Sequence, residues 1–204
     1  SDTRTASDKK SRFSNFEKGR IYEIIATGAV ITVPNPFFTK HESVDGVHGP
    51  LRYPTAGVKA SSDKRSTYQN FEKGRIYSVD KRVVEIHEPL FSAHETLKGV
   101  HGTYPTTDLL KLGDGRGSSQ WFEGGTAWYS TTTGPQFLSG AISDRYLAGG
   151  HAEGPLRYPT AAMAPVGDSR GTVATFEGGN IYATTTTGAH EVRGRSLGIV
   201  GYGN

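Results

Sequence analysis

The clearest pattern along the chain is an alternation of apolar and polar positions on both sides of short glycine turns. Residues 20–32, RIYEIIATGAVIT, alternate with a period of two around a Thr-Gly pair, and residues 180–192, NIYATTTTGAHEV, do the same. Successive side chains of a strand point to opposite faces, so this period predicts β-hairpins. We therefore expect a mainly β protein.

These hairpins belong to a sequence that is repeated four times. The phrase NFEKGRIY occurs at residues 15–22 and, letter for letter, at 70–77, with degraded copies WFEGGTAWY at 121–129 and TFEGGNIYA at 175–183. The shared phenylalanine of each copy lies 55, 51 and 54 residues from the next, at Phe16, Phe71, Phe122 and Phe176. A unit of this size cannot bury a core without its neighbours, so residues 1–204 are interpreted as a single repeat domain.

Two further landmarks suggest where the units begin. An aspartate precedes each shared phenylalanine by eight residues, at Asp8, Asp63, Asp114 and Asp168, and Tyr-Pro-Thr stands ten residues before the second, third and fourth of them. Counting from Tyr202 to the last residue and on from the first residue to Asp8 also gives ten. The spacing predicts a closed, propeller-like ring with units at about 8–62, 63–113, 114–167 and 168–204, the last completed by residues 1–7.

A short helix is expected between each hairpin and Tyr-Pro-Thr. Thr39 with Glu42, and Ser92 with Glu95, have the spacing of capping boxes, while Gly46 and Gly99 suit the left-handed residue that ends a helix. The third copy repeats the pattern from residue 143, and the fourth is too short for it. The expected fold is thus four tandem repeats, each a β-hairpin plus a short helix, with the helix missing from the fourth.

Composition and charge exclude several classes of function. The chain is 34% hydrophobic with 27 glycines, which suits short strands and tight turns. A net charge of +3 is too small for a phosphate-binding field, and no apolar run approaches the ~20 residues that span a bilayer, so neither nucleic acid nor membrane insertion is expected. Cysteine is absent, and the histidines of HESVDGVH and HETLKGVH stand seven apart rather than four, so no metal or cofactor is expected.

The repeat resembles a known family. Copy four reads FEGGNIYATTTTGAHEVRG and copies one and three read GPLRYPTA, an order of motifs similar to the LGFP repeat. The resemblance implies a secreted or cell-surface protein whose repeats hold to wall polysaccharide, here as a lectin-like protein without an attached enzyme. Its partners would be glycans or cell-wall polysaccharide. Arg52 and Arg157 depart from the family, which has glycine at this position.

Residues that recur in every copy are first interpreted as structural. We expect the four shared phenylalanines in the core. The glutamate after each phenylalanine should accept hydrogen bonds from backbone N–H groups. The glycine three residues after each phenylalanine should need a positive φ. These two sets are Glu17, Glu72, Glu123 and Glu177, and Gly19, Gly74, Gly125 and Gly179.

Candidate binding residues are those that break the pattern or offer an aromatic ring. Trp121 stands where other copies have Asn or Thr, so an exposed indole could bind a sugar face, the alternative being surface packing on Lys and Arg stems. Arg52 beside Tyr53, and Arg157 beside Tyr158, could bind hydroxyls or a carboxylate, the alternative being salt bridges between repeats, to Asp63 or Asp168. A further aromatic set lies on the strand face opposite Ile21, Ile76, Ala127 and Ile181, and comprises Tyr22, Tyr77, Trp128 and Tyr182.

Strand alternation predicts that one of these two sets faces the core and the other does not. Together the observations favour a non-enzymatic, carbohydrate-binding protein with several weak sites that act together. Two other classes stay open: a structural, protein-interaction or wall-anchoring module, and a glycan-cleaving enzyme whose catalytic glutamate the sequence does not distinguish from its equivalents. A homo-oligomer is compatible with each of them.

Overall fold

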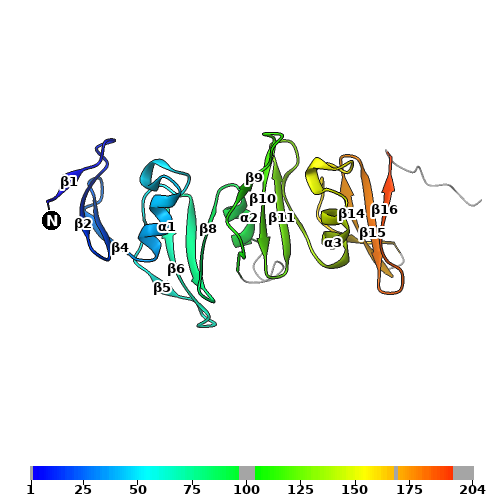
Figure 1. Ribbon diagram of the computed structural model, residues 1–204, viewed down its shortest axis with the longest axis horizontal. Coiled ribbons are helices and arrows are strands. Elements are labelled where there is room, and N and C mark those ends of the chain that lie inside the picture. Colours follow the sequence, from blue (N-terminus) through cyan, green and yellow to red (C-terminus); the bar gives the residue numbers. More distant parts are fainter. Residues whose placement is uncertain (1, 97–103, 168–169, 195–204) are drawn as a thin grey trace, which may run out of the picture. The chain divides into compact units, whose positions relative to one another are not determined.

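The computed structural model describes residues 2–96, 104–167 and 170–194, and these residues form four antiparallel sheets of four strands each (Figure 1). The first sheet has the order β1 (Arg4–Thr5), β2 (Ser11–Phe16), β3 (Gly19–Ile24), β4 (Ala29–Pro34), and the second β5 (Lys59–Ala60), β6 (Ser66–Phe71), β7 (Gly74–Val79), β8 (Arg82–His87). The third contains β9 (Leu110–Lys111), β10 (Gly117–Phe122), β11 (Gly125–Ser130) and β12 (Gly134–Leu138). The fourth contains β13 (Ala164–Pro165), β14 (Gly171–Phe176), β15 (Gly179–Thr184) and β16 (Gly188–Arg193).

The chain divides into two compact units, one of Ser1–Ser92 with Tyr104–Asp108 and one of Ala93–Thr103 with Leu109–Asn204. The expectation of a single domain therefore stays a prediction. Closure into a ring also stays a prediction, because the residues around Tyr202 lie outside those described. Residues 4–5 pair with Phe13 and Arg12, so they form the edge strand of the first sheet, as the other two-residue strands do in theirs.

Within each compact unit a short helix lies between two sheets. In the first unit α1 (Phe37–Ser43) contacts β3 and β4 on one side and β7 and β8 on the other (Figure 1). In the second unit α3 (Gly140–Ala148) lies in the same way between β11 and the pair β15 and β16. A third helix, α2, covers Leu90–Thr96, and short 3₁₀ turns at Gly46–His48 and His151–Glu153 follow α1 and α3.

The predicted hairpins are confirmed, and so is a helix in each of the first three repeats. The capping boxes are wrong, because α1 begins at Phe37 and Thr39 already lies inside it, where its hydroxyl donates to the Asn35 side chain. Ser92 likewise lies inside α2. Gly46 has the predicted left-handed φ of 53°, whereas Gly99 and the end of the fourth repeat lie outside the described residues.

The shared glycine of each copy is required by a close approach of two strands. A side chain at this position would place its Cβ 2.1 to 2.3 Å from a carbonyl oxygen of the neighbouring strand, at Gly19, Gly74, Gly125 and Gly179. The predicted positive φ is present at three of them, Gly19, Gly125 and Gly179. The steric contact is therefore the constraint that all four share.

Both faces are buried in the second and third sheets. Ile76 and Tyr77 are successive residues of β7 that point to opposite faces, yet both are less than 5% exposed. The same holds for Ala127 and Trp128 in β11, at 7% and 0%. The expectation that one of the two sets faces solvent is therefore wrong for these sheets, because each face packs against a neighbouring layer.

The shared phenylalanines occupy the core in three repeats but not in the first. Phe71, Phe122 and Phe176 are 4 to 5% exposed, whereas Phe16 is 53% exposed, so its predicted burial is wrong. Phe71 stacks on His41 of α1 with ring centroids 4.6 Å apart, and Phe176 stacks on Tyr146 of α3 at 4.7 Å. The described residues place no helix on the face of the first sheet that carries Phe16.

This difference gives a matched test. Phe71→Ala should cost ~3–5 kcal/mol of unfolding free energy through the cavity it leaves, and Phe16→Ala less than ~1 kcal/mol because that ring is half exposed. Urea denaturation of the full-length chain measures both. Both substitutions fall in the same eight-residue phrase, so the two sites differ only in burial. Equal losses of unfolding free energy would therefore contradict the structure.

Candidate functional site

The first compact unit contains a cleft of about 350 Å³ between the first sheet and the segment that follows α1. Its wall on the sheet side is formed by Phe13 of β2 and by Arg20 and Tyr22 of β3. Glu42 lines it from α1. The remaining lining comes from the end of β1 with the two residues after it, and from Asp45 with the 3₁₀ turn, and comprises Thr5, Ala6, Ser7, Asp45, Gly46, Val47 and His48. The lining thus combines aromatic rings with hydroxyls and carboxylates.

Four hydrogen bonds hold the Arg20 guanidinium in this cleft. Its Nε donates to the Asn15 side chain at 2.7 Å, because the two residues are direct cross-strand partners in the register of β2 and β3. Its Nη1 and Nη2 donate to the two carboxylate oxygens of Glu42 at 3.0 and 3.1 Å, a bidentate pairing. A further bond from Nη1 reaches the Tyr22 hydroxyl at 2.9 Å.

Two aromatic rings complete the arrangement around Arg20. The guanidinium carbon lies 4.6 Å from the ring centre of Phe13 and 4.7 Å from that of Phe38, distances at which a cation is attracted to a ring face. The Arg20 side chain is 14% exposed. A planar group held by rings and by hydrogen bonds loses little further freedom when a ligand binds beside it, so the site is preorganised.

The second repeat repeats part of this arrangement around Arg75. Arg75 Nε donates to Asn70 at 2.6 Å and Nη1 to the Tyr77 hydroxyl at 2.7 Å. Its guanidinium carbon lies 4.7 Å from the ring centre of Tyr68 and 5.3 Å from that of Phe91. The counterpart of the Asp45–His48 turn falls within residues 97–103, outside the described part of the chain.

The third repeat replaces this arrangement with apolar packing. Thr126 stands where the first two repeats have arginine, and its hydroxyl accepts a hydrogen bond from the Trp128 indole at 2.9 Å and pairs with Ser143 at 3.0 Å. The Trp128 ring is fully buried, stacked with His151 at 5.5 Å and edge-on to Tyr146 at 5.0 Å. The cleft chemistry is therefore confined to the first two repeats among the residues described.

The aspartate and tyrosine landmarks are joined to each other. The hydroxyls of Tyr53, Tyr104 and Tyr158 donate to the carboxylates of Asp8, Asp63 and Asp114 at 2.7, 2.7 and 2.8 Å. Hydrogen bonds from Ser61, from Tyr104 and from the Arg65 backbone lower the pKa of Asp63 to about 2. Burial, together with the nearby Asp8, raises the pKa of Tyr53 to about 12.

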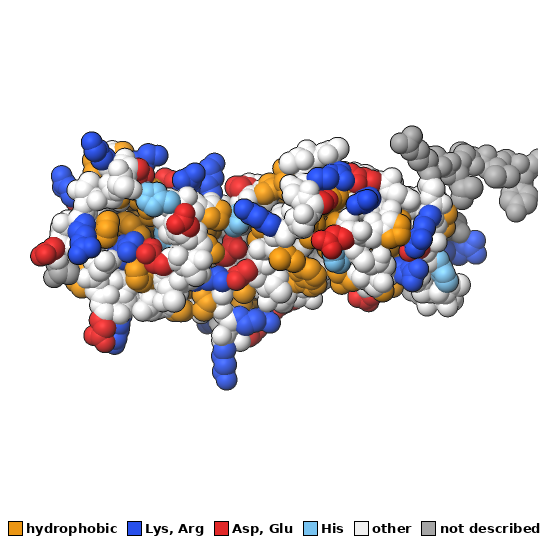
Figure 2. Space-filling view, turned by 45° about the horizontal axis from the view of Figure 1, so that its top comes forward, with side chains coloured by type: hydrophobic (Ala, Val, Ile, Leu, Met, Phe, Trp, Pro, Cys, Tyr) orange, Lys and Arg blue, Asp and Glu red, His pale blue; other side chains and the backbone are white. Residues whose placement is uncertain are grey.

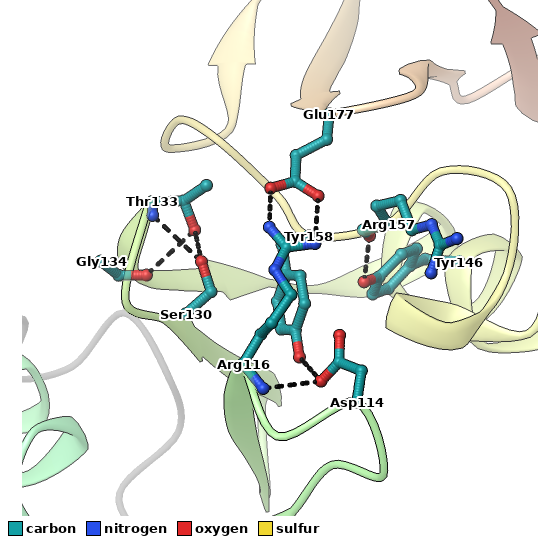
Figure 3. A network of polar contacts seen from close by, with 9 residues as sticks. All are labelled: Asp114, Arg116, Ser130, Thr133, Gly134, Tyr146, Arg157, Tyr158 and Glu177. Carbon is teal, nitrogen blue, oxygen red and sulfur yellow. Dashed lines mark hydrogen bonds and ion pairs between the residues drawn. The ribbon is translucent and has the colours of Figure 1, made fainter.

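In the second compact unit the Tyr158–Asp114 hydrogen bond is part of a larger network of charged residues (Figure 3). Arg116 packs over the Tyr158 ring at 5.1 Å and donates to both oxygens of Glu177 at 2.5 and 3.2 Å. Its backbone N–H donates to Asp114, which also accepts the Tyr158 hydroxyl. Glu177 therefore accepts hydrogen bonds from a guanidinium, and the expected backbone donors are not what it contacts.

Most of the aromatic residues proposed from the sequence are structural. Tyr22, Tyr77 and Trp128, like Tyr53 and Tyr158, are 4% exposed or less, so their rings pack in the interior and their role in ligand binding stays a prediction. They pack between sheet and helix because both faces of the strands are covered. Tyr22 also lines the cleft, where its hydroxyl accepts a hydrogen bond from Arg20.

The other predicted residues lie nearer the surface. Arg52 and Arg157 are exposed, with φ values of 64° and 58°, which explains why glycine suits this position. Their carbonyls accept hydrogen bonds from His41 Nε2 at 2.9 Å and from the Tyr146 hydroxyl at 2.6 Å. The Arg52 guanidinium donates to the His48 carbonyl at 3.4 Å and makes no salt bridge with Asp63, while Asp168 lies outside the described residues.

Trp121 and Tyr182 retain some solvent exposure. Trp121 is partly buried, with its ring 5.9 Å from that of Trp128, and its role as a sugar-binding surface stays a prediction. Tyr182 of β15 is 39% exposed. Neither residue lines the cleft.

Arg20, Glu42 and their partners were not predicted from the sequence as site residues. The capping-box spacing was the interpretation of Glu42, and Arg20 was assigned no role. A signal was available, because Asn15 and Arg20 flank the hairpin turn symmetrically and the same pair recurs as Asn70 and Arg75. Among the described residues, no group of three or more His, Cys, Asp or Glu side chains could hold a metal ion.

The fold and site define a class, a tandem-repeat protein whose four-stranded sheets alternate with short helices. The LGFP repeat matches residues 103–154 and 156–199, which confirms the predicted LGFP repeat over this part of the chain. No curated protein matches it.

Two solved structures are similar in part, the extracellular domains of two hybrid two-component systems from B. thetaiotaomicron. Both are 14% identical, with TM-scores of 0.21 and 0.20, and cover 96% and 98% of this chain. The chain spans 22% and 23% of their length.

The buried His41 gives a test by pH. Burial, with Arg20 nearby, lowers its pKa from 6.5 to about 4, although the bond to the Arg52 carbonyl opposes this. The unfolded chain therefore binds a proton that the folded chain does not, and stability should fall by up to about 3 kcal/mol as the pH drops from about 6.5 to 4.

His41→Tyr is the matched control, since Tyr146 occupies the same place in the third repeat with an equivalent bond and stack. Urea titrations of both proteins between pH 7 and pH 4 isolate the contribution of His41. The same pH dependence in the variant would show that His41 is not the responsible group.

Proposed function

We propose that this protein binds carbohydrate without cleaving it, and that the Arg20 cleft and its Arg75 counterpart are the binding sites. The observation that supports this most directly is the composition of the cleft lining. Sugar hydroxyls both donate and accept hydrogen bonds, and Ser7, His48, Asp45 and Glu42 offer partners of both kinds beside the Phe13 ring. Two such sites in successive repeats would bind weakly one by one and more tightly together.

The charges of the lining favour neutral sugars. Arg20 is already paired with Glu42, and Asp45 adds a further negative charge, so the cleft has no spare cation for a sulfate or a carboxylate. A free anion placed there would meet a like charge. We therefore propose neutral glycans as the ligand class.

Mixed surface charge supports this choice of partner over nucleic acid. On the face seen in Figure 2, basic and acidic side chains are interspersed in both compact units rather than gathered into a basic stripe. None of the helices in the described part of the chain has the length and apolar character to span a membrane. The family resemblance adds an extracellular or cell-surface location to the proposal.

Two alternatives to carbohydrate binding come from the sequence. A glycan-cleaving enzyme needs a carboxylate free to transfer a proton, whereas Glu42 directs both oxygens to Arg20. A structural or protein-interaction module is favoured by a different observation, the exposed apolar residues Phe16, Ile25 and Val30 of the first sheet.

A glycan array probed with the full-length chain tests the proposal. We expect retention of neutral glycans in preference to acidic ones, and a loss of at least about tenfold, ~1.4 kcal/mol, in the Arg20→Ala variant. Arg12→Ala is the control, since Arg12 is an exposed arginine of the same sheet that pairs with Glu23 instead.

Silence across many glycan classes would refute carbohydrate binding. Unchanged binding by Arg20→Ala together with Arg75→Ala would leave glycan binding in place but remove the cleft as its site. Release of soluble sugar from a bound polysaccharide would show instead that the protein is an enzyme.

A further inference from the structure

The outward face of the first sheet has the same sequence as a face that is covered elsewhere in the chain. Residues 15–22 and 70–77 are identical, yet Phe16 is 53% exposed and Phe71 is 4% exposed. Ile21 and Ile76 differ in the same direction, partly buried against fully buried. Because the residues are identical, the difference in exposure comes from a covering layer that the second sheet has and that the first sheet lacks in the described part of the chain.

The second sheet is covered by a closing segment, residues 51–55, that follows α1. Two backbone donors of the repeated phrase bond to it, Glu72 N–H to the Tyr53 carbonyl at 2.9 Å and Lys73 N–H to the Leu51 carbonyl at 3.2 Å. Thr55 N–H donates in return to the Asn70 carbonyl at 3.0 Å. The Phe71 ring then stacks on His41.

The fourth sheet is covered in the same way by the closing segment 156–160. Glu177 and Gly178 donate to the carbonyls of Tyr158 and Leu156, each at 3.0 Å, and Thr160 donates to Thr175 at 2.8 Å. The Phe176 ring stacks on Tyr146 of α3. The pattern of three backbone bonds and one ring stack is thus a recurring docking mode, and it is a form of strand addition to a sheet edge.

On the first sheet the same groups are present and uncovered. Among the described residues, neither the N–H of Glu17 nor that of Lys18 has a backbone partner, and no Tyr-Pro-Thr segment bonds to Asn15. Backbone donors and an apolar ring arranged for a known partner make a receptor for that partner.

We propose that Phe16, Ile21 and the backbone of residues 15–18 form a docking surface for the closing segment of an LGFP repeat on a second polypeptide. The occupant consists of a short helix with a His or Tyr ring, followed by Leu-x-Tyr-Pro-Thr. Among the described residues, segments 51–55 and 156–160 already cover the second and fourth sheets of their own chain. We therefore assign the surface to a partner repeat protein that presents a closing segment of this kind.

The peptide of residues 37–56 is the probe, because it contains α1 and the segment that covers the identical phrase. It is added to the full-length, 15N-labelled chain while the amide shifts of residues 15–22 and 70–77 are followed by NMR. We expect saturable shifts at Glu17 and Lys18 at peptide concentrations below about 1 mM, since a short peptide must be ordered as it binds.

Matched variants locate the binding. Phe16→Asp should weaken it by at least about tenfold, and Ile25→Asp, which removes an exposed apolar residue in the turn after β3, by less than about twofold. A peptide with Leu51→Asp should fail, because the equivalent leucine is fully buried against the second sheet. Both substitutions in the chain are on exposed residues, so folding is preserved.

Three results would overturn the proposal. The first is the absence of saturable shifts at residues 15–18. The second is a response confined to residues 70–77, which would mean that the peptide only displaces its own counterpart. The third is protection of the Glu17 and Lys18 amides from hydrogen exchange in the chain alone, which would mean that the chain covers this face itself.

Discussion

The structure depends on one contact, the insertion of a shared phenylalanine between its own sheet and the helix of the preceding repeat. A four-stranded sheet with apolar residues on both faces is not stable alone, and a helix of seven to nine residues is not either. Sheet and helix share one hydrophobic core where the phenylalanine ring packs on a ring of the helix, Phe71 on His41 and Phe176 on Tyr146. Backbone bonds from the closing segment then fix the distance between sheet and helix.

The cleft is a consequence of this contact. Because His41 on α1 is held by Phe71 and by the Arg52 carbonyl, Glu42, the next residue, is directed back toward the first sheet, where Arg20 binds it. The docking of one repeat thus orders the site of the previous one. It also explains the tolerance for Tyr146 in place of His41, since what the position needs is a flat ring with one donor.

The sequence predicted the elements that follow from local chemistry. Period-two alternation gave the hairpins, and the repeated phrase gave four sheets. The start of α1 was missed because Thr39 and Glu42 fit a cap by spacing alone, whereas packing of Phe37 into the core decides where the helix lies. The exposure of Phe16 was missed for a similar reason, since a repeat implies equal environments and its first member lacks a preceding layer in the described chain.

The candidate site was harder to predict, because it depends on which face each residue of a strand occupies. In the phrase NFEKGRIY the two faces have separate tasks: Asn15, Arg20 and Tyr22 build the cleft, while Phe16 and Ile21 belong to the docking face. The third and fourth copies keep the docking residues, with Phe122 and Phe176 buried, but replace the arginine by Thr126 and Asn180. Burial of the phenylalanine therefore constrains the second, third and fourth copies, whereas the cleft residues Asn, Arg and Tyr occur only in the two copies that repeat the phrase letter for letter.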